Sequence, residues 1–514
     1  MVIGDLLKKS AECYPNKTAI ICGDSETSYK ELNETANKVA NALVGLNLPR
    51  NTNLSILSAN QFDYPSIYFG AAKSGYVLAH LSSRFTNDEL QHVINSTDIG
   101  LIFVHADLLD NLLSVRELTP TLSNIVVFGG SFSDYDSLCS FEVFIDRALA
   151  TEPKVEIDET DAFSITYTGG TTGFPKGVVV NHVSRIIGSV RAEREFNMVA
   201  EDINCCSTPL FHIAGLFVWF QTSIKMGSTC VLLPAWDPEN FIDLVENKNV
   251  TGAFLVPTQI NSVLNHPNFS EIRLKNWRYC SHGGAPTSIA QLERMHEKLP
   301  NVIWEEQYGQ SESGNLTIRP YKFSMEKAGS VGRPFKDVDL AIFDKDGNEL
   351  SVGMSGEVVT KGIQNMMHYY NDPEQTRETF TPDGWLKTGD IGYLDQDGFL
   401  YLVDRSKDMI ISGGENIFPT EIENALYRHP DVDECAVFGI PDDYWGELPA
   451  AHVILKDNTA TKEDDLIEFC TSQIARHKRP RSIKFVDSLP KTAVGKIQKN
   501  VLREPYWKEG SRKI

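Results

Sequence analysis

A chain of 514 residues is too long for one hydrophobic core and predicts two or more domains. Its apolar content of 41% and charged content of 23% are those of an ordinary soluble protein. The net charge of −21 disfavours binding to nucleic acid or to an anionic membrane surface, because both would repel the chain.

The cysteines indicate a reducing environment. Nine of them are scattered along the chain, only Cys205 and Cys206 are adjacent, and no Cys-x-x-Cys or Cys/His ligand spacing occurs. We therefore expect neither a zinc site nor a disulfide framework. Residues 1–9 resemble an amphipathic helix rather than an export signal, which favours the cytoplasm. The longest apolar runs, such as residues 215–220, are too short to span a membrane, so any membrane contact would be peripheral.

Residues 1–160 alternate between helical patterns and short apolar strands. A helix is expected to begin at Tyr29, and its apolar face is formed by Ala36, Val39, Ala40, Leu43 and Val44. Strands are expected at residues 54–57, 101–104 and 125–128. Strands interleaved with helices predict a mostly parallel sheet with both faces covered. We find no residues with catalytic patterns here and interpret this part as scaffold.

A glycine- and threonine-rich stretch follows, between two predicted strands at residues 163–167 and 178–180. Its glycines free the backbone, so that N–H groups can converge on a phosphate, and its threonines and lysine add hydroxyl donors and a positive charge. It differs from the loop of kinases and GTPases, which leads into a helix. We predict that it wraps the β- and γ-phosphates of a nucleotide through Thr168, Gly169, Gly170, Thr171, Thr172, Gly173 and Lys176.

The alternation continues to about residue 330, with strands expected at residues 230–233 and 252–256. Three loops are expected to interrupt it, at residues 209–215, 281–286 and 306–313. Loops that follow the strands of an α/β sheet are where ligands collect.

The pattern changes after residue 335. Short strands separated by Asp-Gly turns predict a small β-rich subdomain at about residues 335–404. Strand, helix and strand signals in residues 407–514 predict a compact α+β domain. The fold class is therefore α/β. A large N-terminal domain, residues 1–406, holds mixed and parallel sheets covered by helices, and a small C-terminal domain follows it.

Residues 167–177 resemble the phosphate-binding signature of the adenylate-forming superfamily, which includes acyl-CoA synthetases, nonribosomal adenylation domains and luciferases. Gly169 stands where serine is commoner, although fatty acyl-CoA ligases often carry glycine there. Residues 308–312, 388–390, 404–405 and 490–497 match further motifs of the superfamily in its order. The resemblance spans the whole chain.

The resemblance implies roles in binding ATP. The Tyr308 ring would face the adenine, a contact worth roughly 1–3 kcal/mol by analogy with base–aromatic stacking, and Ser311 would hold the α-phosphate. Glu312 is a hard oxygen ligand suited to Mg²⁺ and would bind it beside the phosphates. The remaining nucleotide contacts would come from Gly283, Gly284, Ala285, Gly309, Asp390 and Arg405. Gly283 to Pro286 read without the resemblance as a simple turn.

The resemblance also implies a two-step reaction with domain rotation. Lys496 would stabilise the charge that develops when a carboxylate attacks the α-phosphate. Lys407 would be the hinge, although an exposed linker lysine is the plain alternative. Gly413 and Gly414 would line the tunnel for the CoA thiol. Residues 476–481 are strongly basic and either attract CoA phosphates or end a solvated helix.

His212 bears on the substrate. Its loop lacks the Asp that amino-acid-activating relatives use, and Phe217, Trp219 and Phe220 suit an uncharged acyl tail. His212 would gate that pocket, or it is a packed core histidine. The resemblance implies an AMP-forming acid–CoA ligase that uses ATP, Mg²⁺ and coenzyme A, with a medium- or long-chain fatty acid as substrate.

Several alternatives stay open. They are an aryl or short-chain acid, transfer of the acyl-AMP to a carrier protein or to oxygen, and a non-catalytic sensor. The sequence does not decide between a monomer and a homodimer.

Overall fold

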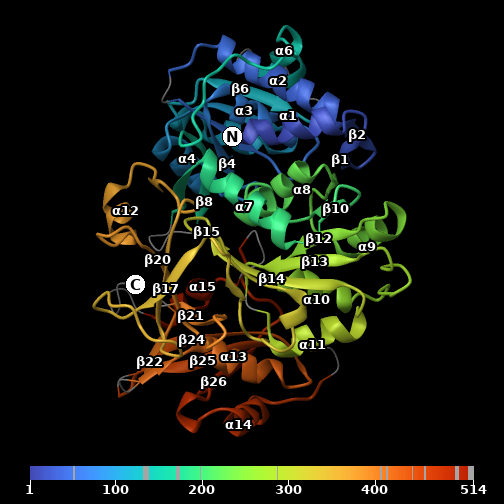
Figure 1. Ribbon diagram of the computed structural model, residues 1–514. Helices are drawn as coiled ribbons and strands as arrows, with labels where there is room; N and C mark the ends of the chain where they lie inside the picture. The colour runs from blue at the N-terminus through green and yellow to red at the C-terminus, as the bar shows by residue number, and fades with distance from the viewer. Residues whose placement is uncertain are drawn as a thin grey trace.

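The computed structural model describes residues 1–49, 52–130, 138–168, 174–196, 198–285, 287–405, 408–412, 415–442, 444–456, 459–492 and 497–507. Figure 1 shows a large N-terminal part, blue to yellow, and a smaller C-terminal part, orange to red, at the opposite end of the molecule. The α/β class and this division into a large and a small part are as the sequence predicts.

The first sheet carries the predicted phosphate loop. It is parallel from β7 to β8 and antiparallel at β9 and β19. Its strands are, in spatial order, β19 (His368–Tyr369), β9 (Lys176–Asn181), β8 (Ala162–Thr168), β4 (Val77–Leu81), β3 (Asn53–Leu57), β5 (Ile99–His105), β6 (Asn124–Phe128) and β7 (Leu138–Ser140). The strands expected at residues 54–57, 101–104 and 125–128 are confirmed.

The second sheet has nine strands and is parallel through its centre. Its strands are, in spatial order, β16 (Arg333–Pro334), β15 (Gly314–Arg319), β14 (Ile303–Gln310), β13 (Tyr279–Gly283), β12 (Gly252–Leu255), β10 (Ile203–Cys206), β11 (Thr229–Leu232), β1 (Thr18–Cys22) and β2 (Ser25–Ser28). The loop expected at residues 306–313 is mostly wrong, because β14 runs to Gln310. Antiparallel pairing with β15 keeps these residues extended.

The other described strands form two smaller, mainly antiparallel sheets. The third sheet consists of β17 (Asp339–Phe343), β18 (Gly356–Lys361), β20 (Leu386–Leu394) and β21 (Leu400–Arg405). The fourth consists of β23 (Glu415–Ile417), β22 (Ile410–Ser412), β25 (Gly446–Leu455) and β24 (Val432–Asp442), with β26 (Ser482–Phe485) parallel to β25. The expected β-rich span is not all in one sheet, since β19 leaves it and pairs with β9.

Helices cover both faces of the large sheets. They are α1 (Ile3–Cys13), α2 (Tyr29–Gly45), α3 (Tyr64–Ser74), α4 (Asn87–Ser96), α5 (Leu109–Val115), α6 (Phe141–Asp146), α7 (His182–Glu195), α8 (Gln221–Met226), α9 (Pro238–Asn247), α10 (Pro257–Leu264) and α11 (Ile289–Lys298). The later helices are α12 (Pro373–Thr379), α13 (Pro419–Tyr427), α14 (Glu463–Gln473) and α15 (Lys499–Arg503). Helix α2 begins where expected because Ser28 and Glu31 form a capping box.

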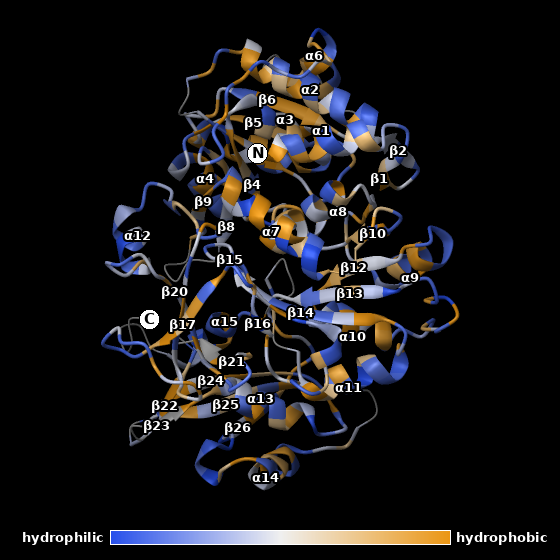
Figure 2. Cartoon of the chain, viewed as in Figure 1, coloured by the Kyte–Doolittle hydropathy of each residue, from blue (hydrophilic) through white to orange (hydrophobic). Residues whose placement is uncertain are grey.

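The core follows the alternation of the strands. In β5, Leu101 and Phe103 pack into one apolar cluster, whereas Ile102 and Val104 pack into another on the opposite face. Figure 2 shows hydrophobic colour on β5 and β6, while the outer helix α2 alternates between both colours. Among the described helices, none has the length and apolar content needed to cross a membrane.

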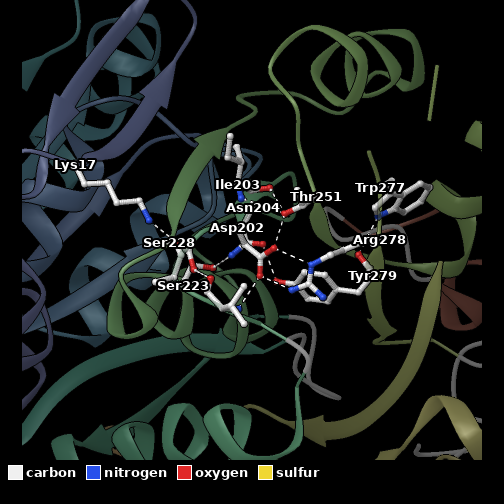
Figure 3. Close-up of polar contacts among 12 residues, drawn as sticks. Lys17, Asp202, Ile203, Asn204, Ser223, Ser228, Thr251, Trp277, Arg278 and Tyr279 are labelled. Carbon is white, nitrogen blue, oxygen red and sulfur yellow. Dashed lines mark hydrogen bonds and ion pairs between the residues drawn. The ribbon is translucent and has the colours of Figure 1, made fainter. Parts of the chain in front are cut away.

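A buried polar network joins the beginnings of several strands in the second sheet (Figure 3). Asp202 is 2% exposed and accepts hydrogen bonds from Arg278 Nε at 2.9 Å and Nη2 at 2.6 Å. It also accepts from the Thr251 hydroxyl at 2.7 Å and from the Val199 backbone N–H at 2.7 Å. One carboxylate therefore joins the starts of β10, β12 and β13.

Asp63, which precedes α3, gives the fold a pH dependence. Burial, with a smaller effect of Glu142, raises the pKa of Asp63 to about 6, and its side chain makes no capping bond to α3. A raised pKa means that the protonated form favours the fold. Its contribution is complete below the unfolded pKa of about 4 and is lost as the pH rises through 6.

We therefore expect Asp63→Asn to increase the free energy of unfolding by about 1–2 kcal/mol at pH 7.5, and to change it little at pH 4. Urea unfolding at both pH values measures this, with the exposed Asp24→Asn as control. An Asp63→Asn effect that does not depend on pH would contradict the assignment.

Candidate functional site

The two ends of the predicted phosphate loop meet at one place in the first sheet. Thr168 ends β8 and Lys176 begins β9, and the two residues are register partners in the antiparallel pair. The loop residues between them, Gly169, Gly170, Thr171, Thr172 and Gly173, lie outside the described residues. Sheet pairing therefore fixes the two residues, Thr168 and Lys176, between which the loop begins and ends.

Glu312, the predicted metal ligand, lies beside this loop although it comes from the second sheet. It follows β14, and its Oε1 accepts from the Thr168 hydroxyl at 3.4 Å and from the Tyr369 hydroxyl at 2.8 Å. Both hydrogen bonds are to Oε1. No hydrogen bond from the described residues occupies Oε2, so this oxygen can bind a cation. No three His, Cys, Asp or Glu side chains of the described chain gather into a metal cluster.

A magnesium ion fits this donor set. Mg²⁺ needs few protein carboxylates when phosphates and water supply its other ligands. One carboxylate, bonded to Thr168 where the predicted phosphate loop begins, is such an arrangement. The single-carboxylate site therefore agrees with a cation that arrives together with a nucleotide.

The predicted adenine and ribose residues also lie together. The Tyr308 hydroxyl donates to Asp390 Oδ2 at 2.6 Å, and Gln310 Nε2 donates to the same oxygen at 2.6 Å. Asp390 is the register partner of Arg405 across β20 and β21. A side-chain hydrogen bond therefore joins Tyr308 to Asp390, and strand pairing sets Arg405 opposite Asp390.

Two of the predicted glycines have a packing requirement of their own. A Cβ at Gly283 would lie 2.2 Å from the Gln307 carbonyl oxygen, and a Cβ at Gly309 would lie 2.1 Å from the Gly314 carbonyl oxygen. Close strand approach alone therefore demands glycine at both positions. Gly284 has φ +79° and makes the turn that carries Ala285 out of β13.

Ser311 is 5% exposed, and its carbonyl accepts from Arg185 Nη2 at 2.6 Å. Arg185 belongs to α7, is 2% exposed and lies over the Phe217 ring at 5.5 Å. Burial lowers the pKa of Arg185 to about 10, and the charge of Glu312 opposes that shift. Arg185 therefore connects the turn at Ser311 and Glu312 to the side chain of Phe217. No sequence pattern pointed to Arg185.

The His212 loop follows β10 and leads into a π-helix at Ala214–Phe220. His212 is half-buried, which does not fit a fully packed core histidine. Trp219 is 1% exposed and donates to the Cys205 carbonyl at 2.9 Å, so it belongs to the core rather than to a ligand pocket. A cavity of about 10 Å³ beside Arg185, Phe217 and Gly314 has room for one water molecule.

The remaining predicted residues lie outside the described part of the chain. They are Lys407, Gly413, Gly414 and Lys496. On either side of residues 493–496, Lys491 and Ile497 form an antiparallel bridge, and Gln498 N donates to the Pro490 carbonyl at 2.8 Å. Nothing described brings Lys496 to the site.

Sequence reasoning missed Tyr369 and Gln375. Gln375 Oε1 accepts from Lys176 Nζ at 2.6 Å, and Tyr369 holds Glu312. Tyr369 belongs to β19, a strand of two residues, and Gln375 to the first turn of α12. Asp372-Pro373 is a helix-start signal, but no local pattern links this segment to the phosphate loop.

Comparison with known proteins adds independent findings. The family model described as AMP-binding enzyme matches residues 7–370, and the one described as AMP-binding enzyme C-terminal domain matches residues 421–496. A long-chain fatty acid–CoA ligase of Mycobacterium tuberculosis is 32% identical, with 98% of each chain covered. A fatty acid–[acyl-carrier-protein] ligase of Streptomyces coeruleorubidus is 32% identical, covering 98% of this chain and 96% of its own. The solved structure of an anthranilate–CoA ligase with anthranoyl-AMP superposes with a TM-score of 0.90 at 28% identity, over 98% of this chain and 97% of its own.

Proposed function

The chain belongs to the AMP-binding enzyme family, in its acyl-CoA synthetase branch, and we propose that it joins a medium- or long-chain fatty acid to coenzyme A at the expense of ATP. The carboxylate attacks the α-phosphorus of ATP and pyrophosphate leaves, which forms acyl-AMP. The CoA thiolate then attacks the acyl carbon and AMP leaves.

One observation carries this proposal: Glu312, which follows β14 of the second sheet, meets Thr168, the register partner of Lys176 in the first sheet. We assign Thr168, Lys176 and residues 169–173 to the β- and γ-phosphates, and Ser311 to the α-phosphate. Bound at Glu312, Mg²⁺ would neutralise charge on the triphosphate. We assign the nucleoside to Gly283, Gly284, Ala285, Tyr308, Gly309, Asp390 and Arg405.

The second half of the proposal is a domain rotation. We propose a large domain at residues 1–406 and a mobile domain at residues 407–514, with Lys407 as the hinge. Lys496 would serve the first step and withdraw for the second, in which Gly413 and Gly414 line the thiol path. The basic residues 476–481 would attract the phosphates of CoA.

We propose a fatty acid because the Mycobacterium relative carries that activity in its name and because the His212 loop has apolar neighbours. Transfer to a carrier protein is the second candidate, favoured by the Streptomyces relative at the same identity. We propose the cytoplasm as the location, since all nine cysteines are free thiols.

A panel of short, medium, long and aromatic carboxylic acids tests the proposal. AMP release is measured with no acceptor, with CoA and with an acyl-carrier protein. We expect AMP release and acyl-CoA formation to be fastest with medium or long chains and CoA. Turnover only with the carrier protein would select the second candidate. Absence of AMP release with every acid would reject both.

A further inference from the structure

A short segment after the third sheet, which includes β19 and the first turn of α12, contacts the predicted phosphate site through Glu312 and Lys176. It leaves the third sheet after β18, and Tyr369 pairs with Val178 of β9, two residues beyond Lys176. The segment holds itself in shape: Thr376 accepts from the Tyr369 backbone N–H at 3.0 Å, and Asp372 caps α12 through the Gln375 N–H at 3.0 Å. Tyr369 and Gln375 are therefore placed by one internally hydrogen-bonded segment.

The site contains two opposite charges that could neutralise each other before a ligand binds. Lys176 and Glu312 carry opposite charges and both adjoin Tyr369, since Lys176 Nζ lies 5.8 Å from the centre of its ring. Two such groups would be expected to pair in the absence of nucleotide, and an ion pair would have to break before a metal-bound triphosphate could use either charge. Among the described residues, however, neither group forms an ion pair.

Each charged group instead has a neutral partner from the same segment. The Tyr369 hydroxyl donates to Glu312 at 2.8 Å, and the Gln375 amide oxygen accepts from Lys176 at 2.6 Å. A neutral partner orients a charge without cancelling it, so the charge remains available to a ligand. Both groups thus contact Tyr369, Glu312 through the hydroxyl and Lys176 near the ring.

We infer that Tyr369 and Gln375 are positioning residues that keep Glu312 and Lys176 apart and oriented for metal-bound ATP. The inference rests on the proposed function, because it assumes that the site binds ATP. It assigns to these two residues a role in nucleotide affinity that is separate from the chemical step.

Tyr369→Phe tests the first half. Removal of the hydroxyl should weaken binding of MnATP about 10- to 150-fold, the usual effect of losing one hydrogen bond to a charged group. The effect is measured by calorimetry in the absence of acid and by the electron paramagnetic resonance of Mn²⁺. Tyr370→Phe is the matched control, because the neighbouring hydroxyl donates to Asp98 and not to Glu312. Tyr370→Phe should bind MnATP like the wild type.

A double-mutant cycle separates positioning from general damage. If Tyr369 acts through Glu312, Tyr369→Phe should weaken MnATP binding little further in a Glu312→Gln background. Equal effects in both backgrounds, or wild-type binding by Tyr369→Phe, would overturn the role of Tyr369. If the wild-type chain does not bind MnATP, the proposed function fails, a result distinct from either of these.

Gln375→Glu tests the second half. A carboxylate beside Lys176 would form the ion pair that the native segment avoids, and ATP affinity should fall about tenfold at low salt and recover partly at high salt. Gln375→Met removes the amide without adding charge and should lower affinity less, with no salt dependence of the difference. Equal affinities of Gln375→Glu and wild type at low salt would overturn this part.

Discussion

Lys496→Ala is expected to lower the rate of acyl-AMP formation by about 10²–10³, whereas the rate of thioester formation from synthetic acyl-AMP and CoA should be nearly unchanged. A positioned ammonium stabilises the charge that collects on the α-phosphorus and on pyrophosphate, and that charge is absent from the second step. Acid-dependent ATP–pyrophosphate exchange measures the first step, and release of AMP from synthetic acyl-AMP measures the second.

Lys491→Ala is the matched control for this experiment. Lys491 is five residues before Lys496 in the sequence, but its ammonium pairs with Glu434 at 2.8 Å and has no proposed part in catalysis. Its loss should leave both half-reactions close to wild type. If Lys496→Ala slowed both half-reactions equally, the proposed withdrawal of the lysine before the second step would be wrong.

Asp202→Ala is expected to cause the largest loss of stability, about 3 kcal/mol, because it removes the carboxylate that pairs with Arg278 and accepts from two further donors. Arg278 donates twice to Asp202, and the Thr251 hydroxyl and Val199 N–H donate as well (Figure 3). The side chain of Arg278 is 36% exposed and can recover some hydration, so we expect the lower end of the range for broken buried pairs.

Urea unfolding followed by tryptophan fluorescence measures this loss, since Trp277 lies in the same part of the second sheet. Glu201→Ala is the control, because Glu201 is the exposed neighbour of Asp202. A shift of the Asp202→Ala transition no larger than that of Glu201→Ala would show that the network does not hold the strand starts together.

The sequence predicted the parts of the site that depend on local composition. The strands that flank the glycine-rich loop follow from period-two alternation and from Val178 to Val180, and the structure places Thr168 and Lys176 at their ends. Helix α2 follows from a capping box and an apolar face. Each of these features depends only on residues that are close together in the sequence.

The predictions that were wrong or missing concern residues whose structure depends on pairing between distant segments. Residues 306–310 read as a loop, yet β15 pairs with them and makes them strand. Tyr369 belongs to a strand of two residues that exists only because β9 lies beside it. Trp219 lies in an apolar run that suited a ligand pocket, but its indole N–H bonds to Cys205 in the core. No local pattern encodes these neighbours.

The most direct test of the central claim follows an oxygen label. A fatty acid with both carboxylate oxygens as ¹⁸O is incubated with the protein, ATP and CoA, and the products are analysed by mass spectrometry. Attack of the carboxylate on the α-phosphorus predicts one ¹⁸O in the phosphate of AMP and none in pyrophosphate. AMP free of label, or label in pyrophosphate or inorganic phosphate, would contradict an acyl-AMP intermediate and the account built on it.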